Sequence, residues 1–185
     1  VERFKKYSNM PSLPNDFSLE DYNILNISIE ATRFQETSFG NKERNLTPNL
    51  AKFAEDESAF VFTRAYSGSS YTVQSFSSLF RMMYPSASGV HLRDPRWDGY
   101  LDENLPTAPG LLSEIGYDNF WRPYSGGGGY KYLLGGFSSR FKDVEDNEKD
   151  EQVLQSAMKA ISKRAKSDAR FFGWVFFSSP HTPYL

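Results

Sequence analysis

Dense apolar runs alternate along this chain with segments in which apolar residues recur at helical spacing. Aromatic and β-branched residues dominate the runs, which predicts strands, at Tyr22–Ile29, Phe60–Tyr66, Tyr117–Trp121 and Phe171–Phe177. The first run is almost continuously apolar, which is typical of a strand covered on both faces of a parallel sheet. The alternation with helices predicts an α/β fold, in which a mostly parallel sheet carries helices on both faces.

The helical segments have recognisable boundaries. After the polar turn Ser67–Ser70, apolar residues recur at helical spacing as far as Met83, which predicts a helix with Thr72 at its start. Capping residues and apolar spacing predict three further helices, at Thr47–Ala54, Thr107–Ile115 and Glu151–Lys166. Gly116 is the expected C-terminal cap of the helix that begins near Thr107.

Thr72 has two interpretations. A hydroxyl at a helix N-terminus lies near unpaired backbone N–H groups and the positive end of the helix dipole. That position favours a bound phosphate or sulfate and an ionising nucleophile. Threonine is also a common N-cap, and the local sequence leaves both interpretations open.

Glu30 falls where the first strand ends, and His181 follows the last strand. Because the carboxyl ends of parallel strands meet at one edge of a sheet and bind ligands there, we expect Glu30, Thr72 and His181 to cluster. A carboxylate held at a strand end can bind a divalent cation. The alternatives are that Glu30 is solvated or paired with Arg33, and that His181 is a packed loop residue.

Three polar segments connect these elements. Residues 1–21 predict a connecting arm, which leaves residues 22–185 as the folded domain. Met83–Pro106 is rich in Pro, Gly and charge, which predicts a loop, either a surface excursion or one that closes over a site. The SGGGG stretch, Ser125–Gly129, lacks the spacing of a phosphate-binding glycine motif and is interpreted as a flexible loop.

Composition narrows the possible functions. The length of 185 residues suits one domain, and a net charge of -2 gives no electrostatic basis for binding nucleic acid or an anionic membrane. With no cysteine, any metal site must use oxygen or imidazole ligands. No apolar run approaches the roughly 18 residues of a membrane span.

The two ends of the sequence suggest a piece of a longer protein. The chain begins with Val1 and stops just after the apolar run that starts at Phe171. We therefore expect an apolar face or edge of the sheet to remain uncovered, and the isolated chain to be prone to aggregation.

Several phrases, taken in order, resemble the sulfatase family of the alkaline-phosphatase-like superfamily over nearly the whole chain. They are YNILNISIEATRF, LTPNLAKFA, FVFTRAYSGSSYTVQSFSSLFRMMYPS, LLSEIGYDNFW and FFGWVFFSSPHTPYL. The resemblance implies a doubly wound α/β sheet with a metal and a nucleophile at strand carboxyl ends. It is compatible with a location in the bacterial cell envelope, which the sequence itself does not specify.

The resemblance also implies roles for individual residues. Glu30 matches the first metal-binding acid of the family, and Thr72 matches the nucleophile, which also contacts the metal. His181 matches a histidine that faces the anionic group of the substrate. Arg33 matches a common arginine whose role is less defined, and an ion pair with a neighbour is the alternative.

The chain departs from sulfatases proper in two places. Their formylglycine nucleophile is made from Cys or Ser, and Thr72 cannot give that aldehyde. The sulfate-clamping Lys and His are replaced by the residues around Arg122 and Tyr124. The pairing of Glu30 with Thr72 instead resembles phosphoethanolamine and glycerol-phosphate transferases, in which a metal-activated threonine forms a covalent phosphoryl intermediate.

These observations predict a metal-dependent hydrolase or transferase that acts on phosphate or sulfate esters through Thr72. The cofactor would be a divalent metal ion such as Mn, Zn, Mg or Ca, and the substrate a small anionic or lipid-linked ester. Further Asp and His ligands expected from the resemblance are absent from this chain, so we expect the chain alone to be inactive. The alternative is a non-catalytic member that keeps the fold as a binding or structural module.

Overall fold

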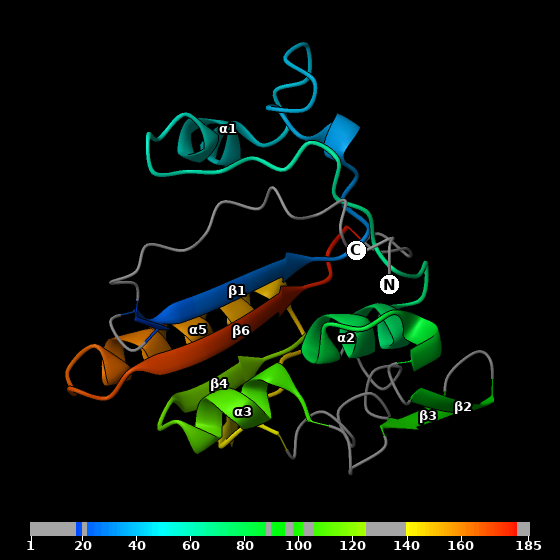
Figure 1. Ribbon diagram of the computed structural model, residues 1–185. Helices are drawn as coiled ribbons and strands as arrows, with labels where there is room; N and C mark the ends of the chain where they lie inside the picture. The colour runs from blue at the N-terminus through cyan, green and yellow to red at the C-terminus, as the bar shows by residue number, and fades with distance from the viewer. Residues whose placement is uncertain are drawn as a thin grey trace.

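A parallel four-stranded sheet forms the centre of the protein (Figure 1). The structure is a computed structural model that describes residues 18–19, 22–87, 90–94, 98–101, 106–124 and 140–180. Adjacent strands of this sheet are all parallel, and their spatial order is β1 (Ile24–Ile29), β6 (Phe171–Phe177), β4 (Asp118–Arg122) and β5 (Asp143–Val144). The predicted parallel sheet is confirmed.

Helices cover both faces of the sheet, as predicted. One face packs against α2 (Thr72–Arg81) and α3 (Ala108–Glu114), and the other against α5 (Asp150–Arg164) (Figure 1). The remaining helices are α1 (Pro48–Ala54) and the short 3-10 helices η3 (Phe34–Glu36) and η4 (Pro85–Ala87). Among the helices that the structure describes, none is long and apolar enough to cross a membrane.

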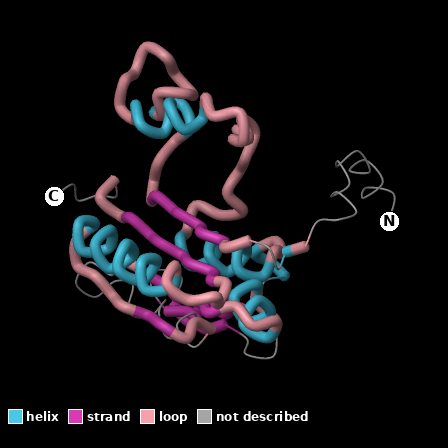
Figure 2. Tube along the Cα trace, turned by 90° about the vertical axis from the view of Figure 1, so that its left-hand side faces the viewer, coloured by secondary structure: helices cyan, strands magenta, loops and turns pink. Residues whose placement is uncertain are grey.

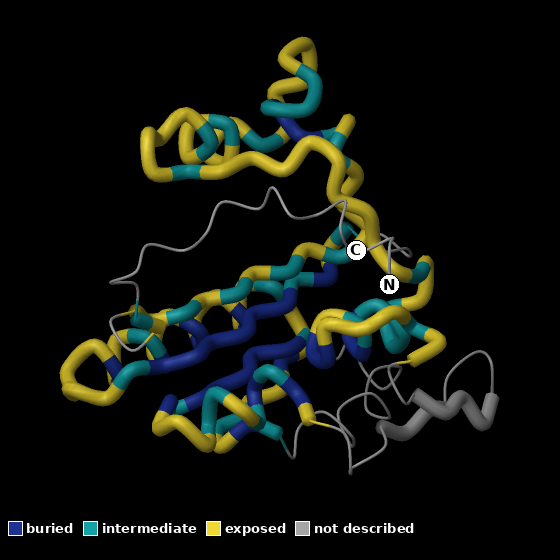
Figure 3. The backbone as a smooth tube through the Cα atoms, viewed as in Figure 1, coloured by how far each residue is buried: buried dark blue, intermediate teal, exposed yellow. Residues whose placement is uncertain are grey.

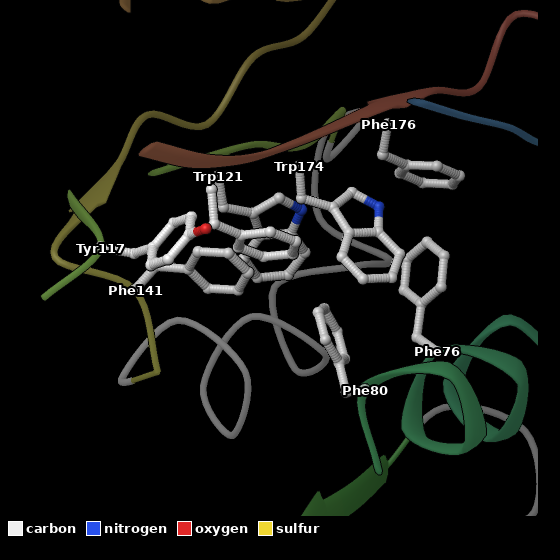
Figure 4. Close-up of a cluster of buried hydrophobic side chains, with 8 residues drawn as sticks. Phe76, Phe80, Tyr117, Trp121, Phe141, Trp174 and Phe176 are labelled. Carbon is white, nitrogen blue, oxygen red and sulfur yellow. The ribbon is translucent and has the colours of Figure 1, made fainter. Parts of the chain in front are cut away.

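The alternation of side chains along β6 divides the core into two layers. Phe172, Trp174 and Phe176 point to the α2 face, whereas Phe171 and Val175 point to the α5 face. The layer under α2 is an aromatic cluster (Figure 4), in which the rings of Phe80 and Trp174 have centroids 4.3 Å apart. Each fully buried aromatic or aliphatic side chain stabilises the fold by roughly 1.5–3 kcal/mol.

The predicted start and end of the helix near Thr107 are confirmed by α3. The Thr107 hydroxyl accepts a hydrogen bond from the Gly110 N–H at the start of the helix. Gly116 has φ 96° just after its end, a conformation that residues with a Cβ adopt only with strain.

The predicted strand at Phe60–Tyr66 is wrong. This stretch has no regular secondary structure and is exposed throughout, with Phe60 87% exposed. It belongs to a segment, residues 31–71, that carries α1 and extends away from the sheet (Figures 1 and 2). Aromatic content gives a strand propensity, but a strand forms only where a neighbouring strand accepts its hydrogen bonds.

The prediction that β1 is covered on both faces is also wrong. Its residues alternate between half-buried and exposed (Figure 3), because α5 lies over β6 and β4 and no helix of the described residues packs closely on the same face of β1. Leu25, Ile27 and Ile29 are the exposed side chains of that face. This confirms the expectation of an uncovered apolar sheet face.

Three strands were missed in segments interpreted as polar connections. The loop predicted at Met83–Pro106 contains an antiparallel pair, β2 (Val90–Asp94) and β3 (Asp98–Leu101). The charged stretch after Phe141 contains β5, which has only two residues and no apolar run to reveal it. Ser125–Gly129 and nearly all of the arm 1–21 lie outside the described residues.

Candidate active site

A cleft of about 1060 Å³ lies where the carboxyl ends of β1 and β6 meet the N-terminus of α2. The order of the strands explains its position, because β1 and β6 are adjacent and parallel and therefore end at the same edge. Three of the four predicted site residues, Glu30, Arg33 and Thr72, line this cleft. Its other lining residues are Ser28, Ile29, Ala31, Thr32, Glu36, Ser67, Ser69, Ser70, Ser75, Phe76, Phe176 and Pro180.

Glu30 is fixed by the backbone around it. Its N–H donates to the Phe177 carbonyl at 2.9 Å, which continues the β1–β6 pairing past the last residue of β1. The next residue, Ala31, has φ 52°, and the Thr32 hydroxyl donates to the Glu30 carbonyl at 3.3 Å. An alanine in the left-handed region is strained, and such strain is found preferentially at functional sites.

Thr72 is the first residue of α2, and Tyr71 occupies the N-cap position without a capping side chain. The interpretation of Thr72 as a simple N-cap is therefore wrong. Its hydroxyl instead donates toward the Glu30 carboxylate, with 3.3 Å to one oxygen and 3.4 Å to the other. These separations are longer than an ordinary O–H···O hydrogen bond, so the two groups face each other without being tightly joined.

A network of serine hydroxyls braces the turn that leads into Thr72. Ser69 accepts from the Tyr71 N–H at 3.1 Å and donates to Gln74 at 2.6 Å. Ser75 donates to the Ser69 carbonyl at 2.8 Å and contacts the Ser67 hydroxyl at 2.8 Å. Sequence reasoning treated these serines only as turn residues, because their pairing depends on how the turn folds back on α2.

Arg33 and Arg122 differ in how the structure places them relative to the cleft. Arg33 is exposed, and the ion pairs between described residues do not include one from Arg33 to Glu30. His181 lies outside the described residues, but Pro180 just before it lines the cleft. Arg122 does not line the cleft, because its buried guanidinium pairs with Asp143 at 2.9 Å.

Glu30 and Thr72 bring together oxygen atoms of the kind that metal sites use. Their oxygens are of the type that hard divalent cations prefer, and two oxygen ligands of one cation typically lie about 3 to 3.5 Å apart. Within the described part of the chain, however, no group of three or more His, Asp or Glu side chains could hold a metal ion. Structural and catalytic sites generally use three or more protein ligands, so these two residues could supply only part of one.

Solved structures with this fold are proteins of the alkaline phosphatase superfamily and enzymes that resemble them. A superfamily protein from Vibrio parahaemolyticus is 24% identical with a TM-score of 0.68, over 88% of this chain and 41% of its own. The phosphonate monoester hydrolase of Agrobacterium radiobacter is 19% identical with a TM-score of 0.63, over 87% of this chain and 41% of its own. A 2-O GAG sulfatase is 20% identical with a TM-score of 0.62, over 86% and 35%.

The parallel sheet and its covering helices thus define an α/β protein with the fold of these structures. The sequence profile of the sulfatase family matches residues 22–185, and the chain belongs to this family, as the sequence phrases predicted. Members of the family are sulfate or phosphate ester hydrolases and are generally metal-dependent. The chain spans less than half the length of the solved structures above, and no curated protein sequence matches it significantly.

Proposed function

We propose that the protein cleaves or transfers a phosphate or sulfate ester and that Thr72 is its nucleophile. The observation that carries this proposal is the placement of the Thr72 hydroxyl. It stands at the first residue of α2, in the cleft, within 3.4 Å of both carboxylate oxygens of Glu30. Membership of an ester hydrolase family supports the reaction class.

The N-terminus of α2 favours an anionic group beside Thr72. The first N–H groups of a helix have no partner within the helix, and the helix dipole places partial positive charge there. No acidic side chain occupies the first turn of α2. An ester phosphate or sulfate bound at this end would receive hydrogen bonds as its negative charge grows in the transition state.

Glu30 has two proposed roles at the Thr72 oxygen. Its carboxylate receives the hydroxyl hydrogen and so directs an oxygen lone pair into the cleft. Glu30 and Thr72 would also contribute oxygen ligands to a divalent cation, together with ligands from outside the described residues. Such a cation supplies positive charge that lowers the pKa of the hydroxyl and offsets the charge of the ester.

The chemical step follows from these positions. The Thr72 oxygen forms a bond to phosphorus or sulfur, and the bond from that atom to the leaving ester oxygen breaks. The leaving oxygen keeps the electron pair of that bond and takes a proton from solvent. The proton of the hydroxyl passes to the Glu30 carboxylate along the existing hydrogen bond. Water, in a hydrolase, or an acceptor alcohol, in a transferase, then attacks the same atom and gives up a proton to solvent. The bond from that atom to the Thr72 oxygen breaks, and Thr72 recovers its proton from Glu30.

Arg33 and His181 complete the proposal as groups that bind the anion. Arg33 lines the cleft and carries a permanent positive charge. His181 follows Pro180, which forms part of the cleft wall. Replacing either residue should raise KM for an anionic ester more than it lowers kcat, if its role is to hold the substrate.

Substitutions at Thr72 and Glu30 test the proposal in the protein expressed from its complete gene. Activity is measured on phosphomonoester, phosphodiester and sulfate ester substrates, and metal binding by calorimetry. Thr72→Ala should lower kcat by about 10³-fold or more while most of the metal binding remains, because the attacking oxygen is lost but the Glu30 carboxylate and the other ligands stay. Glu30→Ala should lose metal and activity together, and Thr72→Ser should retain part of the turnover.

Ser70→Ala is the matched control, because it removes another hydroxyl from the same cleft two residues from Thr72. Its activity should remain within a few-fold of wild type. Full turnover by Thr72→Ala would exclude Thr72 as the nucleophile, and a wild-type protein that cleaves none of these esters would favour the non-catalytic module. Activity on sulfate esters alone would narrow the reaction to sulfuryl transfer.

A further inference from the structure

Asp150 forms a contact that its position in α5 does not explain. It is in the first turn of the helix, where acidic residues commonly interact with the helix's own N–H groups. Here its two carboxylate oxygens point away from its own helix and accept hydrogen bonds from another segment. One oxygen accepts from the Ser178 N–H and the other from the Ser179 N–H, each at 2.9 Å.

The segment that Asp150 holds is the turn that follows β6. Ser178 is buried, and Pro180 lines the cleft beside Glu30 and Thr72, as does Phe176 in the last part of β6. The turn is therefore a wall of the candidate active site. Asp150 itself does not line the cleft, so it can influence the site only through this wall.

The contact is well suited to fixing a position. Two hydrogen bonds from successive N–H groups to one carboxylate define both the location and the orientation of the turn, and a charged acceptor makes each bond stronger than a neutral one. Asp150 stands on α5, which Val153, Ala157 and Ala160 anchor to the sheet. The turn is thus hydrogen-bonded to a helix that is packed on the sheet, and not to another loop.

We propose that Asp150 is a positioning residue that fixes the Ser178–Pro180 wall of the cleft and thereby sets the affinity of the site for its ester substrate. This inference rests on the proposed function of Glu30 and Thr72. Asp150 contacts neither of them, so the reacting groups stay in place when it is removed. The part of the cleft that encloses the bound ester loses its fixed position.

The test compares Asp150→Ala and Asp150→Asn with Glu151→Ala in the protein expressed from its complete gene. Glu151 is the matched control, an exposed carboxylate in the same helical turn. Asp150→Ala should raise KM about tenfold and change kcat less than twofold. Asp150→Asn, whose amide oxygen still accepts one of the two hydrogen bonds, should fall between this variant and wild type, and Glu151→Ala should match wild type.

This pattern separates positioning from a merely structural role. A variant that is only less stable has less folded enzyme, which lowers the apparent kcat and leaves KM unchanged. That result, or an equal effect of Glu151→Ala, would overturn the proposal.

Amide hydrogen exchange provides a second readout that does not depend on activity. In Asp150→Ala the Ser178 and Ser179 amides should exchange at least tenfold faster, while amides within β6 keep their protection. Unchanged protection at these two amides would contradict the proposal even if KM rises. If the wild-type protein cleaves no ester, the proposed function fails, and the exchange result still decides whether Asp150 holds the wall.

Discussion

The four-stranded sheet has a well-covered side, formed by β6 and β4, and a poorly covered side, formed by β1. β6 and β4 are buried on both faces, by the aromatic cluster under α2 and by the contact of Phe120, Phe171 and Val175 with α5. Among the strands that the structure describes, β1 pairs with β6 alone, and no described element covers one of its faces. Trp174 on β6 is 2% exposed, whereas Ile27 on β1 is 55% exposed.

The candidate active site combines one residue from each side. Thr72 belongs to α2, which Phe76 and Phe80 fix to the aromatic cluster over β6. Glu30 follows the end of β1, which pairs with β6 as its one partner among the described strands. The separation of Glu30 and Thr72 therefore depends on how firmly β1 stays paired, and the weaker side of the sheet limits the precision of the site.

The largest difference between the two sides should appear in stability. Trp174→Ala removes the ring at the centre of the aromatic cluster and should lower the free energy of unfolding by about 3–5 kcal/mol. Phe62→Ala removes an aromatic side chain from the exposed segment 31–71, and its effect should stay within about 0.5 kcal/mol. Urea unfolding measures both, and comparable losses would show that the exposed segment is packed in solution.

Stability should be nearly as sensitive to substitution at Gly173, where β6 separates β1 from β4. A Cβ on Gly173 would lie 2.4 Å from the ring of Phe120 and 2.9 Å from Leu25 Cδ1, so a side chain there must push these two side chains aside and, through them, presses on β4 and β1. Gly173→Ala should cost about 1–3 kcal/mol. Activity should fall as well, because displacement of β1 carries Glu30 away from Thr72. A stable variant with full activity would contradict this close approach.

A matched pair on β1 distinguishes its two faces. Ile24 packs against the aromatic cluster, whereas Ile27 is on the bare face. Ile24→Thr should lower the free energy of unfolding by about 1–2 kcal/mol, and Ile27→Thr by less than about 0.5 kcal/mol. Light scattering of Ile27→Thr should also show less aggregation than wild type, because the apolar patch is smaller. An equal cost at both positions would mean that the bare face is covered in solution.

The smallest effect concerns acid stability on the buried side. Burial tends to raise the pKa of Asp143, but hydrogen bonds and charge from Arg122 and Arg164 outweigh it and hold the pKa below the usual 3.8. A lowered pKa means that Asp143 stabilises the fold above that value and that this stabilisation is lost as the pH falls through the lowered pKa. Its carboxylate is 34% exposed, so solvent screening limits the contribution to about 1 kcal/mol.

Unfolding measured between pH 6 and pH 2 checks this sign. Asp143→Asn should be less stable than wild type at pH 6, and the difference should shrink below about pH 4, where wild type loses the same charge. A difference that stays constant as the pH falls would contradict the contribution of the ionised carboxylate.

The comparison also shows which parts of the fold the sequence could reveal. β4, β6, α2 and α5 have apolar residues at a clear period because each packs against a covered surface. Phe60–Tyr66 is equally aromatic but exposed, since apolar content alone does not decide whether a partner strand is available. β5 was missed because two residues cannot show a period.

The candidate site was partly visible from the sequence. The rule that ligands bind at strand carboxyl ends, together with the family resemblance, placed Glu30 and Thr72 together, and both line one cleft. Their catalytic roles stay predictions. The serine network and Asp150 could not be found, because Asp150 meets Ser178 across 28 residues of chain and no local pattern records that contact.

The most direct test of the central proposal is mass spectrometry of the protein quenched during turnover of a phosphodiester, after expression from its complete gene. A covalent intermediate should add a phosphoryl-type group to the peptide that contains Thr72. The fragment spectrum should place the group on the Thr72 oxygen, and the modification should be absent from Thr72→Ala. Turnover of a slowly cleaved substrate with no adduct on Thr72 in the quenched protein would contradict the account. An adduct on another residue would contradict it as well.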